Sequence, residues 1–219
     1  PTVKQLMNNG SYTLEKRSVL PSSSAVNWAS MFMGAGPELH GYTEWGSKTP
    51  ELPSRELSHY GIFPSIWGVF RDANPEAEIG FFCQWGGLEY LAEMKAMSKE
   101  MHVKAEDDPS GKADKAVATQ SCIYIKEKKP AFVGIFFDEP DHTGHKSGHD
   151  TEAYYQKLEE LDGYIAEIVN AVKEAGMWDE TIFIVTADHG GINKGHGGKT
   201  MQEMQTPFII AGKGIKKGY

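Results

Sequence analysis

The sequence predicts an α/β domain with a mostly parallel, doubly wound sheet and helices on both faces. Two continuous apolar runs, at residues 131–137 and 181–186, are typical of strands buried on both faces. Between them, residues 151–175 carry apolar side chains at spacings of three and four, which predicts an amphipathic helix packed on the core. Strands that alternate with a helix in this way favour a parallel crossover unit.

The other elements are expected at regular intervals along the chain. Further strands are predicted at 17–20, 79–83 and 207–211, and further helices at 25–33, 65–71, 88–97 and 112–126. Ser24 is the expected N-cap of the helix at 25–33, and Gly34 its stop. Two loops are expected. The short one covers 101–109, and the long one, at 34–64, is rich in Gly, Pro, Ser and Thr and indicates a functional or lid-like segment.

Length and composition indicate one globular domain over residues 1–219, because 40% hydrophobic residues suffice for a sizeable core. The formal net charge is -8 and the basic residues are dispersed, which disfavours a nucleic-acid polymer as partner. No apolar run approaches the roughly 20 residues of a membrane span. Cys83 and Cys122 are expected to be unpaired thiols, one buried on a strand and one on a helix.

Candidate metal ligands follow both apolar strands. Asp141 and His145 come shortly after residue 137, and Asp188 and His189 come directly after the strand at 181–186. Ligands in doubly wound sheets gather at the carboxyl ends of the strands, and carboxylate and imidazole groups suit zinc or manganese. Taken alone, Asp141 and His145 are more typical of a polar loop, whereas Asp188 and His189 favour a metal over an ordinary polar turn.

Three more histidines lie near these pairs. His196 stands between two glycines and becomes a candidate ligand because it follows Asp188 and His189 by only a few residues. His142 and His149 are expected to lie near the ligands or to face solvent, without binding a metal themselves.

The third candidate segment is the hydroxyl cluster of Ser22, Ser23 and Ser24, directly before a predicted helix. Helix capping by Ser24 would account for it without any chemistry. The functional interpretation is that the helix N-terminus attracts a phosphate, while a hydroxyl beside a metal attacks phosphorus. Asn27, one turn along, would then donate to a phosphate oxygen.

Together these segments resemble the alkaline phosphatase superfamily, and most closely its nucleotide pyrophosphatase/phosphodiesterase branch. The resemblance is carried by the order of five pieces, which are Ser24 with Asn27, the P-E-L-H-G segment at 37–41, the E-P-D-H-T-G-H segment at 139–145, the D-H-G segment at 188–190, and His196-Gly197. The order is specific although no single piece is. It implies an alkaline-phosphatase-like fold.

The resemblance also implies roles for individual residues. Ser24 would be the nucleophile, forming a phosphoseryl intermediate, and Asn27 would bind phosphoryl oxygens. Two divalent metal ions are implied, zinc with manganese as the alternative. One would be held by Asp141, His145 and His196, and the other by Asp188, His189 and the Ser24 oxygen. The implied substrate is a small phosphate ester, with a preference for diesters that rests on the resemblance alone.

The sequence departs from the family pattern in one metal ligand. The family supplies a further Asp from its first strand, ahead of the nucleophile, whereas no Asp precedes Pro21. We therefore expect a fragment that lacks the first strand and the C-terminal part of the domain. A metal-binding module without catalysis is the alternative. The resemblance implies a periplasmic or extracellular location, which the sequence itself leaves open.

Two alternatives concern the substrate. Sulfatases share this fold, but the C/S-x-P-x-R segment that they carry is absent from residues 22–28, which disfavours sulfatase chemistry; a phosphomonoesterase remains open. Aromatic residues around the long loop could stack on a nucleobase or an aryl leaving group. We expect them instead to pack the loop onto the domain; they are Tyr42, Trp45, Tyr60 and Trp85.

Overall fold

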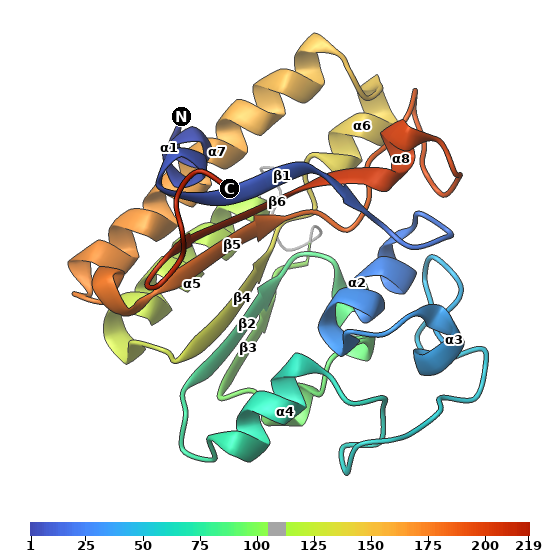
Figure 1. Ribbon diagram of the computed structural model, residues 1–219, viewed down its shortest axis with the longest axis horizontal. Coiled ribbons are helices and arrows are strands. Elements are labelled where there is room, and N and C mark those ends of the chain that lie inside the picture. Colours follow the sequence, from blue (N-terminus) through green and yellow to red (C-terminus); the bar gives the residue numbers. More distant parts are fainter. Residues whose placement is uncertain (105–112) are drawn as a thin grey trace.

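The computed structural model describes residues 1–104 and 113–219, and Figure 1 shows its strands between two groups of helices. The strands form two three-stranded ladders. One has the order β1 (Gly10–Arg17), β6 (Gln205–Gly212), β5 (Ile182–Thr186), and the other has the order β3 (Lys99–His102), β2 (Ile79–Cys83), β4 (Phe132–Phe136). β2 pairs in parallel with both β3 and β4. β6 is antiparallel to both of its neighbours.

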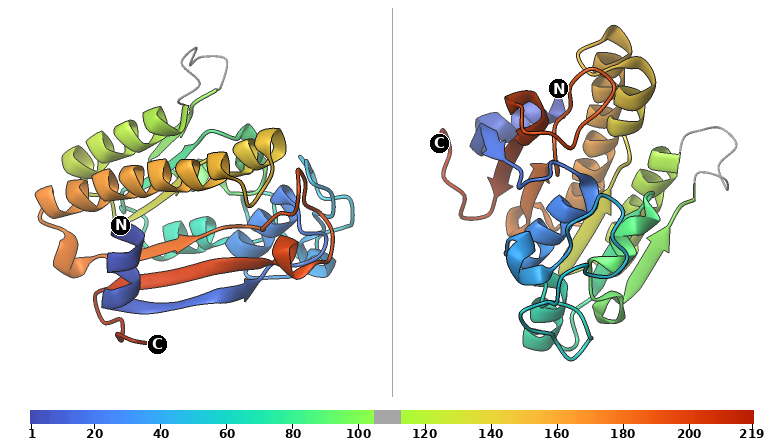
Figure 2. Two further views of the ribbon diagram at one scale, coloured as in Figure 1. Left: turned by 90° about the horizontal axis from the view of Figure 1, so that it is seen from above. Right: turned by 90° about the vertical axis from the view of Figure 1, so that its right-hand side faces the viewer.

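The helices lie on both sides of the strands. In the two views of Figure 2, α5 (Ala113–Lys128) and α7 (Glu152–Glu174) run side by side over one face, and α2 (Ser24–Met33) and α4 (Ile66–Ala73) lie on the other. Shorter helices complete the set, and they are α1 (Thr2–Asn9), α3 (Pro37–His40), α6 (Asp141–Ser147) and α8 (Met201–Met204). The predicted α/β class with helices on both faces is confirmed.

The alternation of side chains along β2 explains why both faces are covered. Phe81 packs against Phe32 of α2 and Trp67 of α4, whereas Phe82 faces the opposite way and contacts Tyr124 of α5. Successive side chains of a strand point to opposite faces, so an all-apolar strand requires a cover on each side. All five residues of β2 are buried.

Helix ends follow the expected local chemistry with one exception. Ser65 caps α4 by accepting the Trp67 N–H at 3.2 Å, and α2 ends at Gly34, which adopts a left-handed conformation with φ of 60°. The prediction that Ser24 is the N-cap of α2 is wrong. Ser23 holds that position, and Ser24 is the first helical residue. Its side chain is therefore free of a capping role.

Three other boundary predictions are wrong. The strand expected at 17–20 lies earlier, at β1, because its ladder with β6 spans Gly10 to Arg17. The helix expected at 88–97 is two short 3₁₀ turns, at 86–90 and 94–96, because the intervening Glu93 is buried and accepts N–H groups from residues of α4 and its cap. Residues 101–102 belong to β3 instead of a loop. The rest of the expected loop from residue 105 on, and residue 112 of the expected helix at 112–126, lie outside the described residues.

The expectation that residues 131–137 and 181–186 are buried on both faces is also wrong. Every residue of β4 is partly exposed, and Ile182 and Ile184 of β5 are 51% and 55% exposed. β4 and β5 each stand at the end of a ladder within the described residues, so each has one strand neighbour there. Cys83 on β2 and Cys122 on α5 are unpaired thiols, as predicted, although Cys122 is only half-buried. Across the described residues, no helix has the length and apolarity that a membrane span requires.

Candidate metal centre

Asp141, His145 and His196 come together at one end of the sheet. Asp141 and His145 lie one turn apart on α6, which follows β4, and His196 comes from the loop after β5. The Asp141 carboxylate lies 3.3 Å from His145 Nε2 and 3.6 Å from His196 Nε2. One ligand atom from each residue lies within 4.8 Å of the other two, so this group could hold a metal ion.

Backbone carbonyls set the tautomers of the three histidines at the site. His145 Nδ1 contacts the Lys194 carbonyl at 2.9 Å, His196 Nδ1 the Ser22 carbonyl at 3.0 Å, and His189 Nδ1 the Gly190 carbonyl at 2.8 Å. A carbonyl oxygen only accepts, so each Nδ1 carries the proton and each Nε2 keeps its lone pair. This is the arrangement in which imidazole binds a metal through Nε2.

Two features of the cluster are costly without a cation. The Nε2 atoms of His145 and His196 face each other at 3.1 Å, which brings two lone pairs together. Asp141 Oδ1 is buried and has no hydrogen-bond partner among the described residues, although leaving a buried carboxylate oxygen unpaired costs free energy. A divalent cation would satisfy both, so the residues present fit a metal ion. Carboxylate and imidazole donors suit zinc or manganese.

Asp188, His189 and Ser24 form a second group that adjoins the first. His189 Nε2 lies 3.2 Å from Ser24 Oγ and 3.3 Å from Asp188 Oδ2. The rings of His189 and His196 stack with centroids 3.7 Å apart. Burial raises the pKa of Asp188 while the neighbouring His189 lowers it, so this carboxylate needs a positive partner to stay ionised. The predicted ligands therefore form one continuous site.

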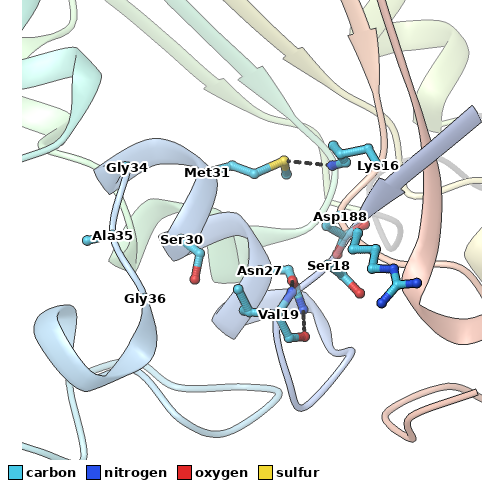
Figure 3. Close-up of a pocket in the computed structure, with 11 residues that line it drawn as sticks. Lys16, Ser18, Val19, Asn27, Ser30, Met31, Gly34, Ala35, Gly36 and Asp188 are labelled. Carbon is cyan, nitrogen blue, oxygen red and sulfur yellow. Dashed lines mark hydrogen bonds between the residues drawn. The ribbon is translucent and has the colours of Figure 1, made fainter. Parts of the chain in front are cut away.

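Asn27 is buried and engaged elsewhere. Its side-chain oxygen accepts the Val19 N–H at 2.7 Å, and its amide donates to the carbonyls of Pro21 and Ser23 at 3.0 Å each. Figure 3 shows the side chain turned toward Val19. In this structure Asn27 holds the loop that presents Ser24. Its contact with a phosphoryl oxygen stays a prediction.

Of the remaining predicted neighbours, neither His142 nor His149 belongs to the metal-binding group. His142 is exposed on α6. His149 Nδ1 contacts the Asn193 carbonyl at 3.0 Å, and its ring lies beside that of Tyr154. The exposed His142 agrees with the expectation that such a residue faces solvent, and His149 with the alternative that it lies near the candidate ligands.

The loop that carries His196 is held by Ser22 and Glu203, for which the sequence predicted no such positioning role. Ser22 Oγ accepts the Gly197 N–H at 3.1 Å and donates to the Gly198 carbonyl at 2.6 Å. The buried Glu203 accepts the Gly198 N–H at 2.8 Å and also forms a capping box with Thr200 at the start of α8. The T-x-x-E spacing of that box is readable in the sequence and could have identified Glu203.

Lys16 is a further residue near the site that the sequence did not identify. Its ammonium donates to the Ala187 carbonyl at 2.7 Å, next to Asp188, and approaches the sulfur of Met31 at 3.4 Å (Figure 3). Burial lowers the pKa of Lys16, and the charge of Asp188 opposes this shift. Lys16 reaches the site only because β1 pairs with β6, a long-range contact that no local pattern signals.

Asp114 holds the turn between β4 and α6 from the opposite side. Its two carboxylate oxygens accept the backbone N–H groups of Asp138 and Glu139, each at 2.9 Å. Asp114 is buried in α5, and burial raises its pKa to about 6 although these two hydrogen bonds lower it. The segment that leads to Asp141 is thus fixed by a carboxylate that titrates near neutral pH.

We expect this pKa to make folding stability depend on pH. The folded-state pKa lies above the ordinary value, so the native state binds a proton more tightly than the unfolded chain, and this stabilisation is lost as pH rises through about 6. Relative to Asp114→Asn, the wild type should gain roughly 1 kcal/mol between pH 7.5 and pH 5. Urea unfolding with a chelator present measures this difference. If the free energy of unfolding changed with pH by the same amount in both proteins, the raised pKa assigned to Asp114 would be wrong.

The sequence matches the family described as type I phosphodiesterase / nucleotide pyrophosphatase over residues 1–196. Ectonucleotide pyrophosphatase/phosphodiesterase family member 1 of Rattus norvegicus is 22% identical over 196 residues, covering 87% of this chain and 21% of the relative. Bis(5'-adenosyl)-triphosphatase ENPP4 of Bos taurus is 42% identical over 60 residues, covering 27% of this chain and 13% of the relative. The chain thus spans about a fifth or less of these two relatives' length.

Solved structures show the same fold at low identity. A 2-O GAG sulfatase superposes with a TM-score of 0.74 at 15% identity, covering 99% of this chain and 59% of that structure. The murine ectonucleotide pyrophosphatase / phosphodiesterase 5, in complex with AMP, gives a TM-score of 0.64 at 21% identity and covers 87% of this chain and 51% of that one. A phosphodiesterase structure and a sulfatase structure therefore share this architecture, and the fold alone does not decide between their chemistries.

Proposed function

Because the chain belongs to the type I phosphodiesterase / nucleotide pyrophosphatase family, we propose that it hydrolyses phosphate esters, and phosphodiesters in particular, with Ser24 as the nucleophile. The observation that carries the proposal is the 3.2 Å contact between Ser24 Oγ and His189 Nε2, beside the cluster of Asp141, His145 and His196. The names of the relatives, which are phosphodiesterases and a dinucleoside triphosphatase, support a small phosphate ester as substrate.

Ser24, His189 and the N-terminus of α2 have different roles in the proposed reaction. Without a cation, the Nε2 lone pair of His189 accepts the hydrogen bond of the Ser24 hydroxyl; when a cation is bound, this lone pair would bind it instead, beside the Ser24 oxygen. The N-terminus of α2, where Ser24 stands, carries partial positive charge that attracts the phosphoryl group. Attack by Ser24 forms a phosphoserine and releases the alcohol, and water then hydrolyses the phosphoserine.

Two divalent cations fit the two groups, with zinc as the first candidate and manganese as the second. Asp141, His145 and His196 would hold one, and Asp188, His189 and the Ser24 oxygen the other. When bound, such ions lower the pKa of hydroxyl groups and stabilise the charge on the leaving oxygen. On the residues present, the first group has three side-chain donors, and the second has two besides the Ser24 oxygen.

The test is hydrolysis by the metal-loaded protein. We expect bis(4-nitrophenyl) phosphate to be cleaved faster than 4-nitrophenyl phosphate, 4-nitrophenyl sulfate to be left intact, and a chelator to abolish turnover until zinc is returned. Metal analysis of the same sample should find two ions per chain. One tightly held ion without hydrolysis of any of the three esters would overturn the proposal and favour a metal-binding module.

A further inference from the structure

The loop that carries His196 makes a tight turn directly before it. Ile192 and Gly195 close this turn with two reciprocal backbone hydrogen bonds, at 2.9 and 3.0 Å. The two residues between them are Asn193, which has a left-handed conformation with φ of 51°, and Lys194. The carbonyls of both accept hydrogen bonds from histidine rings, one on α6 and one just after it. The position of His196 relative to α6 is therefore set through this turn.

His149, two residues after the end of α6, makes two of these bonds. Its backbone N–H and its ring Nδ1 both contact the Asn193 carbonyl oxygen, at 2.6 and 3.0 Å. A carbonyl oxygen has two lone pairs and only accepts, so Nδ1 carries the proton and both contacts are hydrogen bonds. The bond to the Lys194 carbonyl comes from His145, which is itself a candidate ligand. His149 thus connects the loop to α6 from outside the metal-binding group.

Two glycines leave the space that the ring of His149 occupies. A Cβ added to Gly144, the residue before His145 on α6, would lie 2.5 Å from His149 Nε2, and one added to Gly191 in the loop would lie 2.1 Å from the same atom. Neither glycine has a positive φ, so space and not backbone conformation requires glycine here. The ring therefore lies between α6 and the loop, with the ring of Tyr154 beside it at a centroid distance of 5.2 Å.

Such a connection has its largest effect before a cation binds. The Nε2 atoms of His145 and His196 face each other at 3.1 Å with a lone pair each, which costs free energy when no cation lies between them. The two bonds from His149 hold the turn before His196 against α6 despite this cost. Ligands that are already held in place bind an ion more tightly, because less conformational entropy is lost on binding.

We propose that His149 is a positioning residue for the metal-binding group, which holds His196 at ligand distance from the two ligands on α6 before the ion binds. The inference rests on the part of the proposed function that assigns a cation to this group, and it does not depend on which ester is hydrolysed. It also gives a physical reason for Gly144 and Gly191, since a side chain at either position would displace the ring.

The test is the affinity of the whole chain for the first zinc ion, measured by competition with a chromogenic chelator. We expect His149→Ala to weaken it about 10-fold or more. His149→Asn should restore most of the affinity, because its amide nitrogen takes the place of Nδ1, whereas His149→Gln, whose amide nitrogen corresponds to Nε2, should not. The control is His142→Ala, which removes an exposed histidine of the same helix and should bind zinc as the wild type does.

The contact with Gly191 supplies an independent test. Gly191→Ala places a methyl group against the ring, so it should weaken zinc binding severalfold in the wild-type background. In the His149→Ala background the ring is absent and the same substitution should cost little, which makes the two changes non-additive. Equal losses of affinity in the two backgrounds would show that the methyl group acts elsewhere, and they would overturn this placement of the ring.

The outcomes separate the inference from the proposed function. If folded His149→Ala binds zinc like the wild type, or if the Asn and Gln variants bind it equally, the positioning role is wrong while the hydrolase assignment stands. If the affinities follow the expectation but no ester is cleaved, the proposed function fails and the inference stands.

Hydrogen exchange in chelator tests the connection without any metal. The Gly195 N–H is bonded to the Ile192 carbonyl inside the turn. It should exchange faster in His149→Ala than in the wild type, because the turn is no longer held against α6. This result supports the inference even if the wild type binds no zinc and the proposed function fails. Equal exchange in the two proteins overturns the inference.

Discussion

Ser24→Ala is expected to abolish turnover of bis(4-nitrophenyl) phosphate, by at least about a thousandfold in kcat, because it removes the proposed nucleophile. Fold and stability should change little. Ser24 is the first residue of α2, and within the described residues its hydroxyl caps no helix and has its one side-chain hydrogen bond with His189. Zinc at Asp141, His145 and His196 should also remain, since this group needs no atom from Ser24. The measurements are steady-state kinetics, metal content and a thermal melt on the same preparation.

The neighbouring hydroxyl provides a matched control. Ser23 is buried, and its Oγ makes no hydrogen bond. Ser23→Ala therefore removes an unsatisfied polar group and should keep kcat within a few-fold of wild type, with equal or higher stability. If Ser24→Ala retained turnover while Ser23→Ala lost it, the register of the nucleophile would be wrong. If both retained it, the hydrolysis would not pass through this hydroxyl cluster.

That the candidate ligands come together at one edge of the sheet could be predicted from the sequence, because the position of each is set locally. Asp188 and His189 follow the last residues of β5, and Asp141 follows β4 by a short turn, so the strand ends carry them to one edge. The contacts that orient these side chains could not be predicted from the sequence. They are made with the Ser22, Gly190 and Lys194 carbonyls that fix the tautomers, and two of the three histidines contact a carbonyl more than 40 residues away.

Two errors in the predicted fold share one cause, which is long-range contact. The apolar pattern of residues 88–97 is compatible with a helix, but Glu93 bonds to the N-terminus of α4 and breaks the segment into turns. β5 reads as a buried strand, yet Ile182 and Ile184 are half exposed because the partners of a strand are set by topology and not by its own composition. By contrast α4 and α7 begin at a side-chain cap, a signal within one turn, and their starts were predicted to within one residue.

Asp141→Asn should change stability with opposite signs in chelator and in zinc. Without a metal, the Asp141 carboxylate has an unsatisfied buried oxygen. Burial raises the pKa of Asp138 and of Asp188, and the charge of Asp141 adds to both shifts. Replacing this charge with an isosteric amide relieves the repulsion, so in chelator the melting temperature of Asp141→Asn should lie above that of wild type, by roughly 2–4 °C for a gain of about 1 kcal/mol.

In zinc the order should reverse. Ligand at about 100 times its Kd stabilises a protein by about 2.7 kcal/mol, which for a domain of this size corresponds to a rise of roughly 5–10 °C for wild type. Asp141→Asn should show little of that rise, because a neutral amide replaces the anionic donor that bridges His145 and His196. The exposed Asp150 supplies the control, since Asp150→Asn changes net charge equally and should follow the wild type in both conditions. A variant that melts lower than wild type in chelator and keeps the full zinc shift would show that Asp141 stabilises the fold and binds no metal.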